Sequence, residues 1–186
     1  MWKGADAVVV PVGKANEDEP EFTKSKAVHR YLLQYEFQDT VMVFSSAGLH
    51  VLSAAKKVGF LTPLAAEAKK VGVNVTLLTR NKVDANKANF AAMVGAIKGS
   101  HGGAKVAGFL KEKASQTGAV CAGWAAAAAA AGLEAVEGAQ GMASFLSVKA
   151  PVRERGAEGL CVCVFVCVYI WKGEGAGARG SYKLVV

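Results

Sequence analysis

The sequence predicts an α/β fold in which a mixed β-sheet is flanked by helices, and three observations support this prediction. Short apolar runs rich in valine recur along residues 1–149. Between them lie segments whose apolar residues repeat at helical spacing, and strands that alternate with helices are typical of one sheet covered by helices. Two of the runs are separated by only a few small residues, which predicts an antiparallel hairpin and therefore a sheet that is not purely parallel.

The first predicted element is a buried strand over residues 7–12, which ends at Gly13. Pro11 has no N–H to donate to a neighbouring strand, so we expect this strand to lie at a sheet edge or to end at the proline. A helix follows, and either Thr23 or Ser25 can cap its N-terminus. The apolar stripe of this helix consists of Val28, Tyr31, Leu32 and Tyr35.

Residues 40–44 and 48–52 are predicted to be two strands joined by a hairpin loop of small residues. A short helix over residues 54–61 comes next. Thr62 and Pro63 are suited to the N-cap and the first position of a new helix, which the next glycine would end. We therefore expect the helical segment to restart at Thr62.

Residues 73–79 form the next predicted strand, with alternate residues on one face. Asp84 is placed to cap the helix that follows, and Gly99 is placed to end it. The strand face consists of Val73, Val75 and Leu77, and the helix stripe consists of Phe90, Met93, Val94 and Ile97.

Residues 105–110 are the last predicted strand, and a final helix extends from about Val120 through the alanine run 125–131. Alanine is the best helix former, but it buries little apolar area. We therefore expect this helix to pack weakly, with Trp124 as its main anchor.

The composition is that of a globular chain, with 52% hydrophobic and 20% charged residues. The net charge of +7 is scattered and forms no dense basic run, so we expect no direct DNA binding. No apolar segment approaches the ~20 residues that span a bilayer, and we expect neither membrane attachment nor a signal peptide. Cys121 is the one cysteine of residues 1–149, which indicates an intracellular protein.

Residues 150–186 differ from the rest, and we predict that they form an aberrant low-complexity tail outside the fold. The run Leu160–Trp171 is uncharged and alternates cysteine with valine in two places. A TGT-GTG dinucleotide repeat encodes this alternation, so our hypothesis is that the tail translates a non-coding stretch such as a retained intron. Finding the same tail in spliced, polysomal message would contradict that hypothesis.

Two binding sites in the tail are considered and rejected. A zinc site on three cysteines has the wrong spacing and lacks a histidine. A dinucleotide site on three glycines would have to open a helix and be followed by an acidic residue about 20 positions on, which is not the case. The two sets are Cys161, Cys163 and Cys167, and Gly175, Gly177 and Gly180.

Residues 1–149 contain no pattern typical of an active site, and we predict neither catalysis nor a bound cofactor or metal. We expect His29 and His50 to point away from the core and His101 to lie in a loop. Glu36 and Asp39 are expected to serve as a turn and a cap. The acidic run 17–21 is expected to be a solvated loop, and Cys121 is expected to be a buried small hydrophobic residue. The glycine-rich loop 99–103 is not expected to bind phosphate, because it precedes a strand rather than a helix.

Five blocks of residues occur in a characteristic order and spacing. The blocks are 6–13, 25–44, 56–61, 75–90, and 105–109 with Trp124 downstream. The most specific is Tyr35-Glu36-Phe37 followed by Asp39-Thr40 and Met42. Over residues 2–149 the blocks resemble the N-terminal domain of the large subunit of the FACT histone chaperone complex.

The N-terminal domain of that family is similar in fold to the pita-bread metallopeptidases aminopeptidase P and creatinase but lacks catalysis. The resemblance implies that residues 1–149 are its leading lobe and lack the second lobe, which carries the metal ligands in the peptidases. It also implies a nuclear, chromosomal protein that acts in nucleosome reorganisation during transcription, replication and DNA repair. The implied partners, through the full-length protein, are histones and the small HMG-type FACT subunit, with replication or transcription proteins as further candidates.

The sequence departs from the family at Gln34, where glycine is usual, and lacks a helix that normally precedes the Trp2 region. Residues 1–149 carry 17 basic and 12 acidic residues, a net charge of +5 that does not favour basic histones as simple electrostatic partners. Two alternatives stay open: the leading lobe of a metal-dependent aminopeptidase or creatinase-like enzyme, and a truncated product without function.

Overall fold

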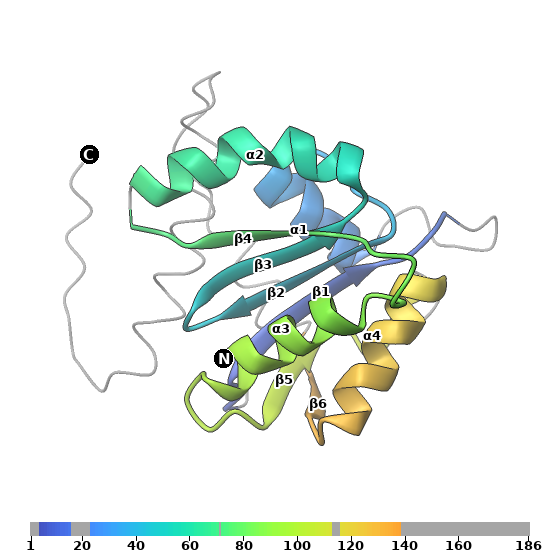
Figure 1. The fold of residues 1–186 in the computed structure, drawn as a ribbon. Helices are drawn as coiled ribbons and strands as arrows, with labels where there is room; N and C mark the ends of the chain where they lie inside the picture. The colour runs from blue at the N-terminus through green and yellow to red at the C-terminus, as the bar shows by residue number, and fades with distance from the viewer. Residues whose placement is uncertain (1–3, 16–22, 71, 113–115, 139–186) are drawn as a thin grey trace.

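The computed structural model describes residues 4–15, 23–70, 72–112 and 116–138. They form a six-stranded sheet with helices on both faces (Figure 1). The strand order is β4-β3-β2-β1-β5-β6, and only β2 is antiparallel to its neighbours. The predicted mixed sheet is therefore confirmed. The strands are β1 (Ala7–Val12), β2 (Thr40–Ser45), β3 (Gly48–Ser53), β4 (Val75–Thr79), β5 (Lys105–Gly108) and β6 (Glu134–Glu137).

Each face of the sheet has its own apolar core. Helices α1 (Lys24–Leu33) and α2 (Ala55–Lys70) cover one face, and α3 (Lys87–Lys98) and α4 (Ala119–Ala130) cover the other. Successive strand residues point to opposite faces, so alternate residues of β1 pack in different cores. This explains the valine-rich run: all six residues of β1 are buried, as a strand covered on both faces requires.

Of the two outcomes expected from Pro11, an edge strand is wrong, whereas the strand does end close to the proline, at Val12. β1 is a central strand with β2 on one side and β5 on the other. Its pairing with β5 covers only Ala7 and Val8, whereas its pairing with β2 extends to Val12. The Gly13 carbonyl accepts from the Asp39 N–H on the β2 side, so the donor that Pro11 lacks, two residues earlier, belongs to the β2 ladder, and the strand ends one residue after the proline. Burial of valines on both faces outweighs the one backbone donor that proline lacks.

The prediction that a new helix starts at Thr62 is also wrong, because α2 is one helix of 16 residues with Pro63 inside it. Proline in a helix crowds the carbonyl four residues earlier and leaves it without a donor. That residue is Gly59. Apart from its neighbours in the helix, no described atom lies within 4 Å of the place where a Cβ of Gly59 would be, so this turn is not crowded from outside. The Thr62 hydroxyl donates to the Val58 carbonyl at 3.1 Å and adds a local bond to this turn.

The last two elements differ in how well the pattern predicts them. The helix expected from Val120 is confirmed as α4, and its Trp124 is buried with its ring centroid 6.2 Å from that of Phe90. The sequence pattern did not predict β6. Its four residues are exposed or half-buried, so pairing with β5 defines this strand rather than an apolar run.

Helix α1 begins as predicted, with Thr23 as N-cap and its hydroxyl accepting from the Lys26 N–H at 3.4 Å. Tyr35 was expected in the apolar stripe, but it lies beyond the helix and is 64% exposed. The helix ends at Gln34 with φ of 56°, in the left-handed region that glycine adopts most easily. The departure from the family at this position thus has a structural consequence: a residue with a Cβ occupies a glycine conformation.

Replacing Gln34 with glycine is expected to stabilise the fold by about 0.5–1 kcal/mol, because it removes left-handed strain. The gain is reduced by the loss of the bond from Gln34 Nε2 to the Tyr31 carbonyl, which is 3.1 Å long. Urea unfolding measures the change. Gln34→Ala is the matched control, since it keeps the strain and loses the bond, and an alanine variant as stable as the glycine variant would contradict this explanation.

The described ranges leave several predictions outside the structure. These are the acidic run 17–21 and the whole tail 150–186, with its cysteine and glycine motifs. Among the described helices, none has both the length and the apolar character needed to cross a membrane.

Candidate functional site

The carboxyl ends of the parallel strands β1, β3, β4 and β5 lie at one edge of the sheet. In open α/β sheets, ligands bind at this edge, in the crevice where the strand order reverses. Here it reverses between β1 and β5, because the chain proceeds from β1 to β4 and then returns to the other side of β1. We call this region the carboxyl edge; it comprises Gly13, Lys14, Asp39, Arg80, residues 109–112 and residues 116–118.

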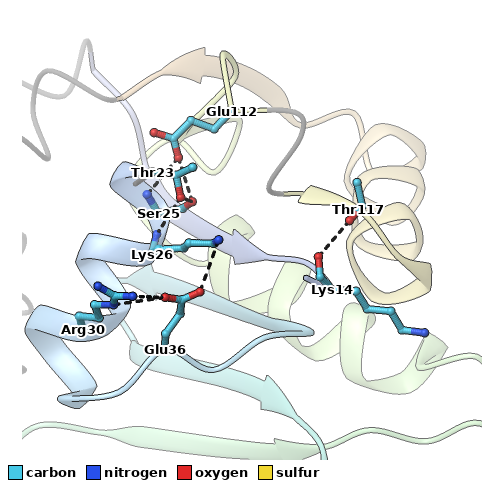
Figure 2. A network of polar contacts seen from close by, with 8 residues as sticks. All are labelled: Lys14, Thr23, Ser25, Lys26, Arg30, Glu36, Glu112 and Thr117. Carbon is cyan, nitrogen blue, oxygen red and sulfur yellow. Dashed lines mark hydrogen bonds and ion pairs between the residues drawn. The ribbon is translucent and has the colours of Figure 1, made fainter. Parts of the chain in front are cut away.

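Residues 116–118 fill the crevice at the carboxyl edge. The Thr117 carbonyl accepts from the Lys14 N–H at 3.2 Å, and the Thr117 hydroxyl donates to the Lys14 carbonyl at 3.2 Å (Figure 2). Gln116 Nε2 donates to the Phe109 carbonyl at 2.7 Å, so the segment bridges the ends of β1 and β5. Gly13 permits this approach, because a Cβ there would lie 2.2 Å from the Thr117 carbonyl oxygen. The chain's own backbone therefore occupies the place where a doubly wound sheet binds its ligand.

Glu112 joins the N-terminus of α1 to the loop after β5. Its carboxylate accepts from the backbone N–H groups of Lys24 at 2.7 Å and Ser25 at 3.0 Å, and from the Ser25 hydroxyl at 2.8 Å (Figure 2). A carboxylate at a helix N-terminus satisfies N–H groups that have no partner in the helix and opposes the helix dipole. Sequence reasoning missed this role of Glu112.

Asp39 and Arg80 form an ion pair at the carboxyl edge, with Asp39 Oδ2 and Arg80 Nη1 2.6 Å apart. Their side chains are 14% and 21% exposed. Asp39 precedes β2 and Arg80 follows β4, so the pair ties these strands together across β3. The turn expected at Asp39 is present, with φ of 56° and its N–H donating to the Gly13 carbonyl at 2.8 Å. The ion pair was not predicted.

Two more charged side chains, Lys57 and Glu36, bind other parts of the lobe. Lys57 of α2 donates to the Gln38 carbonyl, and burial lowers the pKa of Lys57 while the Asp39 carboxylate opposes that shift. Glu36 was expected at a turn and forms ion pairs with both basic residues of α1 that face it, Arg30 at 3.0 Å and Lys26 at 3.6 Å (Figure 2). The carboxylates of this region thus hold the lobe's own elements together.

The glycine-rich loop 99–103 is bound by a carboxylate from the start of β1. Asp6 accepts from the backbone N–H groups of Gly102 at 2.8 Å, Ala104 at 2.9 Å and Lys105 at 2.8 Å. Burial alone would raise the pKa of Asp6, but these bonds and the nearby His101 lower it below its ordinary value. The N–H groups that face this carboxylate therefore already have an anionic partner.

The prediction that His29 is solvated is wrong, because the imidazole is completely buried. The buried face of α1 is wider than the predicted stripe and also includes His29, between Ser25 and Leu33. Burial lowers the pKa of His29 to about 4. The Val10 backbone opposes this shift, and the charge of Lys57 adds to it. His29 is therefore neutral at pH 7.

His29 is expected to make the fold acid-sensitive. His29 becomes protonated near pH 6.5 in the unfolded chain but only near pH 4 in the folded chain. Its contribution to the free energy of unfolding is therefore fully present above pH 6.5 and is lost as the pH falls towards 4. The expected loss is about 2 kcal/mol at pH 5. Urea unfolding at pH 7 and pH 5 measures it, with His29→Gln as the control that cannot titrate. Equal pH dependence of the two proteins would contradict the assignment.

The remaining candidates have ordinary structural places. His50 was expected to point away from the core; it lies on the face of β3 that carries Leu52, towards α3 and α4, and is half-buried, which lowers its pKa. His101 lies in a turn, as predicted. Cys121 is buried, as predicted, and burial, with a smaller effect of the Asp39 charge, raises the pKa of its thiol to about 12. Within the described ranges, no group of three His, Cys, Asp or Glu side chains could hold a metal ion.

Comparison with known proteins gives a consistent result. Residues 1–141 match the family model of the FACT complex subunit SPT16 N-terminal lobe domain. The chain is 29% identical over 154 residues to FACT complex subunit SPT16 of Dictyostelium discoideum, which covers 80% of this chain and 14% of that protein. It is 34% identical over 113 residues to FACT complex subunit ctc-2 of Neurospora crassa, which covers 60% of this chain and 10% of that protein.

Two solved structures share the fold. The N-terminal domain of FACT complex subunit SPT16 from Cicer arietinum superposes with a TM-score of 0.69 at 26% identity, over 81% of this chain and 34% of that one. The corresponding domain from Eremothecium gossypii gives 0.66 at 25% identity, over 78% and 34%. The chain thus spans about a third of the solved domains and a smaller part of the full-length relatives. The expected lobe fold is confirmed.

Proposed function

Because the chain belongs to the family of FACT complex subunit SPT16 N-terminal lobe domains, we propose that it is a non-catalytic binding lobe of a FACT-type histone chaperone subunit. In this proposal residues 1–149 are the lobe and residues 150–186 lie outside it. The protein acts in the nucleus, in nucleosome reorganisation during transcription, replication and DNA repair. Its partners are histones and the other FACT subunits.

The filled crevice is the observation that carries the non-catalytic part of the proposal. A catalytic site needs groups that are free to reach a substrate. At the carboxyl edge, the backbone of Thr117 occupies the ligand position, and Glu36, Asp39 and Glu112 are engaged in bonds within the lobe. These contacts favour a rigid frame that presents surfaces to partners.

The charge balance restricts how such a frame would contact histones. Residues 1–149 carry 17 basic and 12 acidic residues. Bulk charge therefore repels the basic histone tails rather than attracting them. We propose that contacts are made to folded histone surfaces or to partner subunits, where apolar and hydrogen-bonding groups dominate.

Titration of fluorescently labelled partners with the purified chain tests this function. At about 150 mM salt we expect saturable binding to at least one of the two native pairs of core histones in the micromolar range, and weaker binding to a duplex of about 30 base pairs. Binding of the duplex in preference to both histone pairs would contradict the proposal. Hydrolysis of a peptide substrate by the longer gene product, in the presence of Mn²⁺, Co²⁺ or Zn²⁺, would also contradict it. That result would favour the aminopeptidase or creatinase-like alternative, in which the second lobe carries the metal ligands.

A further inference from the structure

Strand β4 is the outermost strand on one side of the sheet, and no described residue pairs with its outer side (Figure 1). On its inner side, the Asn74 carbonyl accepts from the Leu49 N–H and the Arg80 N–H donates to the Ser53 carbonyl, both at 2.9 Å. Backbone groups alternate in direction along a strand, so the even-numbered residues face β3. The N–H groups of Val75, Leu77 and Thr79 therefore face outward.

This edge lacks the usual features that prevent strand addition. Residues 75–79 are Val-Thr-Leu-Leu-Thr, which favour β-structure and include neither charge nor proline. All five residues are exposed or half-buried. One end is partly covered, because Asn89 Nδ2 donates to the Thr79 carbonyl at 2.8 Å. The rest of the outer edge can accept a strand.

The charges on either side of β4 determine which strand fits. Lys69 and Lys70 end the helix that precedes β4, where Lys70 also pairs with Glu67 at 2.6 Å, and Lys82 follows the strand. Antiparallel pairing of β4 with a second copy of the chain would bring the lysines before one strand close to Lys82 after the other, and like charges opposite each other are unfavourable. A segment with acidic residues at both ends is attracted at both ends instead.

We propose that the β4 edge binds an extended segment of a partner protein as a seventh strand. The segment has β-branched residues at its centre and Asp or Glu at both ends. Its side chains on the α2 side meet Val75 and Leu77, which already pack against that core, so they are apolar. This interaction does not depend on histone binding.

Amide hydrogen exchange of the 186-residue chain tests the proposal, with the capped peptide EDVTVTVDE as probe. Without peptide, the amides of Thr76 and Leu78 exchange slowly because they face β3, whereas those of Val75, Leu77 and Thr79 exchange quickly. At about 1 mM peptide, we expect exchange at Val75, Leu77 and Thr79 to slow by about tenfold or more. The peptide KKVTVTVKK and an N-methylated form of the acidic probe are the controls, and neither should protect these amides.

A charge reversal tests the specificity in the protein itself. Lys82→Glu should weaken protection by the acidic probe, because one of its two attractive ends is lost, while Lys111→Glu, on the loop after β5, should leave that protection unchanged. Absence of alternate-residue protection at any probe concentration up to about 1 mM would overturn the proposal and leave the lysines with the role of preventing aggregation. Equal protection by the acidic and basic peptides would overturn the charge requirement.

Discussion

Replacing Gly13 with alanine is expected to destabilise the fold by about 3 kcal/mol or more, the upper end of what overpacking costs. The new Cβ would lie 2.2 Å from the Thr117 carbonyl oxygen and 2.5 Å from its nitrogen. These are backbone atoms that cannot rotate away, so the 116–118 segment has to leave the crevice. Urea unfolding measures the loss, and faster exchange of the Lys14 amide, which donates to Thr117, locates it.

Gly95→Ala is the matched control for this variant. Gly95 lies inside α3, and in the part of the chain that the structure describes no atom outside its own helix backbone lies within 4 Å of its hypothetical Cβ. Alanine there is expected to stabilise the fold by up to about 1 kcal/mol, because it is the better helix former. A Gly13→Ala variant that is as stable as the native chain, with an unchanged Lys14 amide, would show that Thr117 does not fill the crevice.

Removal of the Asp39 carboxylate is expected to have a comparable effect. Asp39→Ala leaves Arg80 unpaired in a site where it is only 21% exposed, and breaking such a pair costs about 3–5 kcal/mol when it is fully buried. Because the Asp39–Arg80 pair is partly exposed, we expect a cost near the lower limit of that range. Alanine also adds strain at φ of 56°. Urea unfolding should therefore show a loss of about 3 kcal/mol.

Three variants separate these causes. Asp39→Asn keeps a residue that tolerates the left-handed conformation, so it should lose less than Asp39→Ala. Arg80→Met in the Asp39→Ala background should recover part of the loss, because it removes the charge that Asp39→Ala leaves unpaired. Glu67→Ala removes an exposed ion pair with Lys70 and should change stability by less than about 1 kcal/mol. Equal losses at Glu67 and Asp39 would contradict a special role for the carboxyl-edge pair.

Local patterns predicted the elements of this fold better than their arrangement. The helical stripe of α3 and the valine run of β1 are contiguous signals, and both elements are present, although α3 has Asn86 rather than the expected Asp84 at its N-cap. The errors at Pro11 and Pro63 have one cause: rules for proline describe local cost, whereas burial from distant elements decides whether that cost is tolerated. Strand β6 has no such signal, because its pairing partner rather than its composition defines it.

The carboxyl edge could not be predicted from sequence for a related reason. Glu112 contacts α1 across 87 and 88 residues, and Arg80 contacts Asp39 across 41. Contacts of this length leave no periodic signal in a single sequence. The family resemblance, by contrast, depends on the order and spacing of residue blocks, and the match over residues 1–141 confirms it.

In the proposed function, this lobe works by binding, within a nuclear FACT-type complex. Immunoprecipitation from nuclear and cytosolic fractions of the source cells, with an antibody against residues 87–98 of α3, tests it most directly. We expect the protein to be recovered from the nuclear fraction together with histones and a small HMG-type subunit, identified by mass spectrometry. Recovery from the cytosol without histones or that subunit would contradict the proposed function.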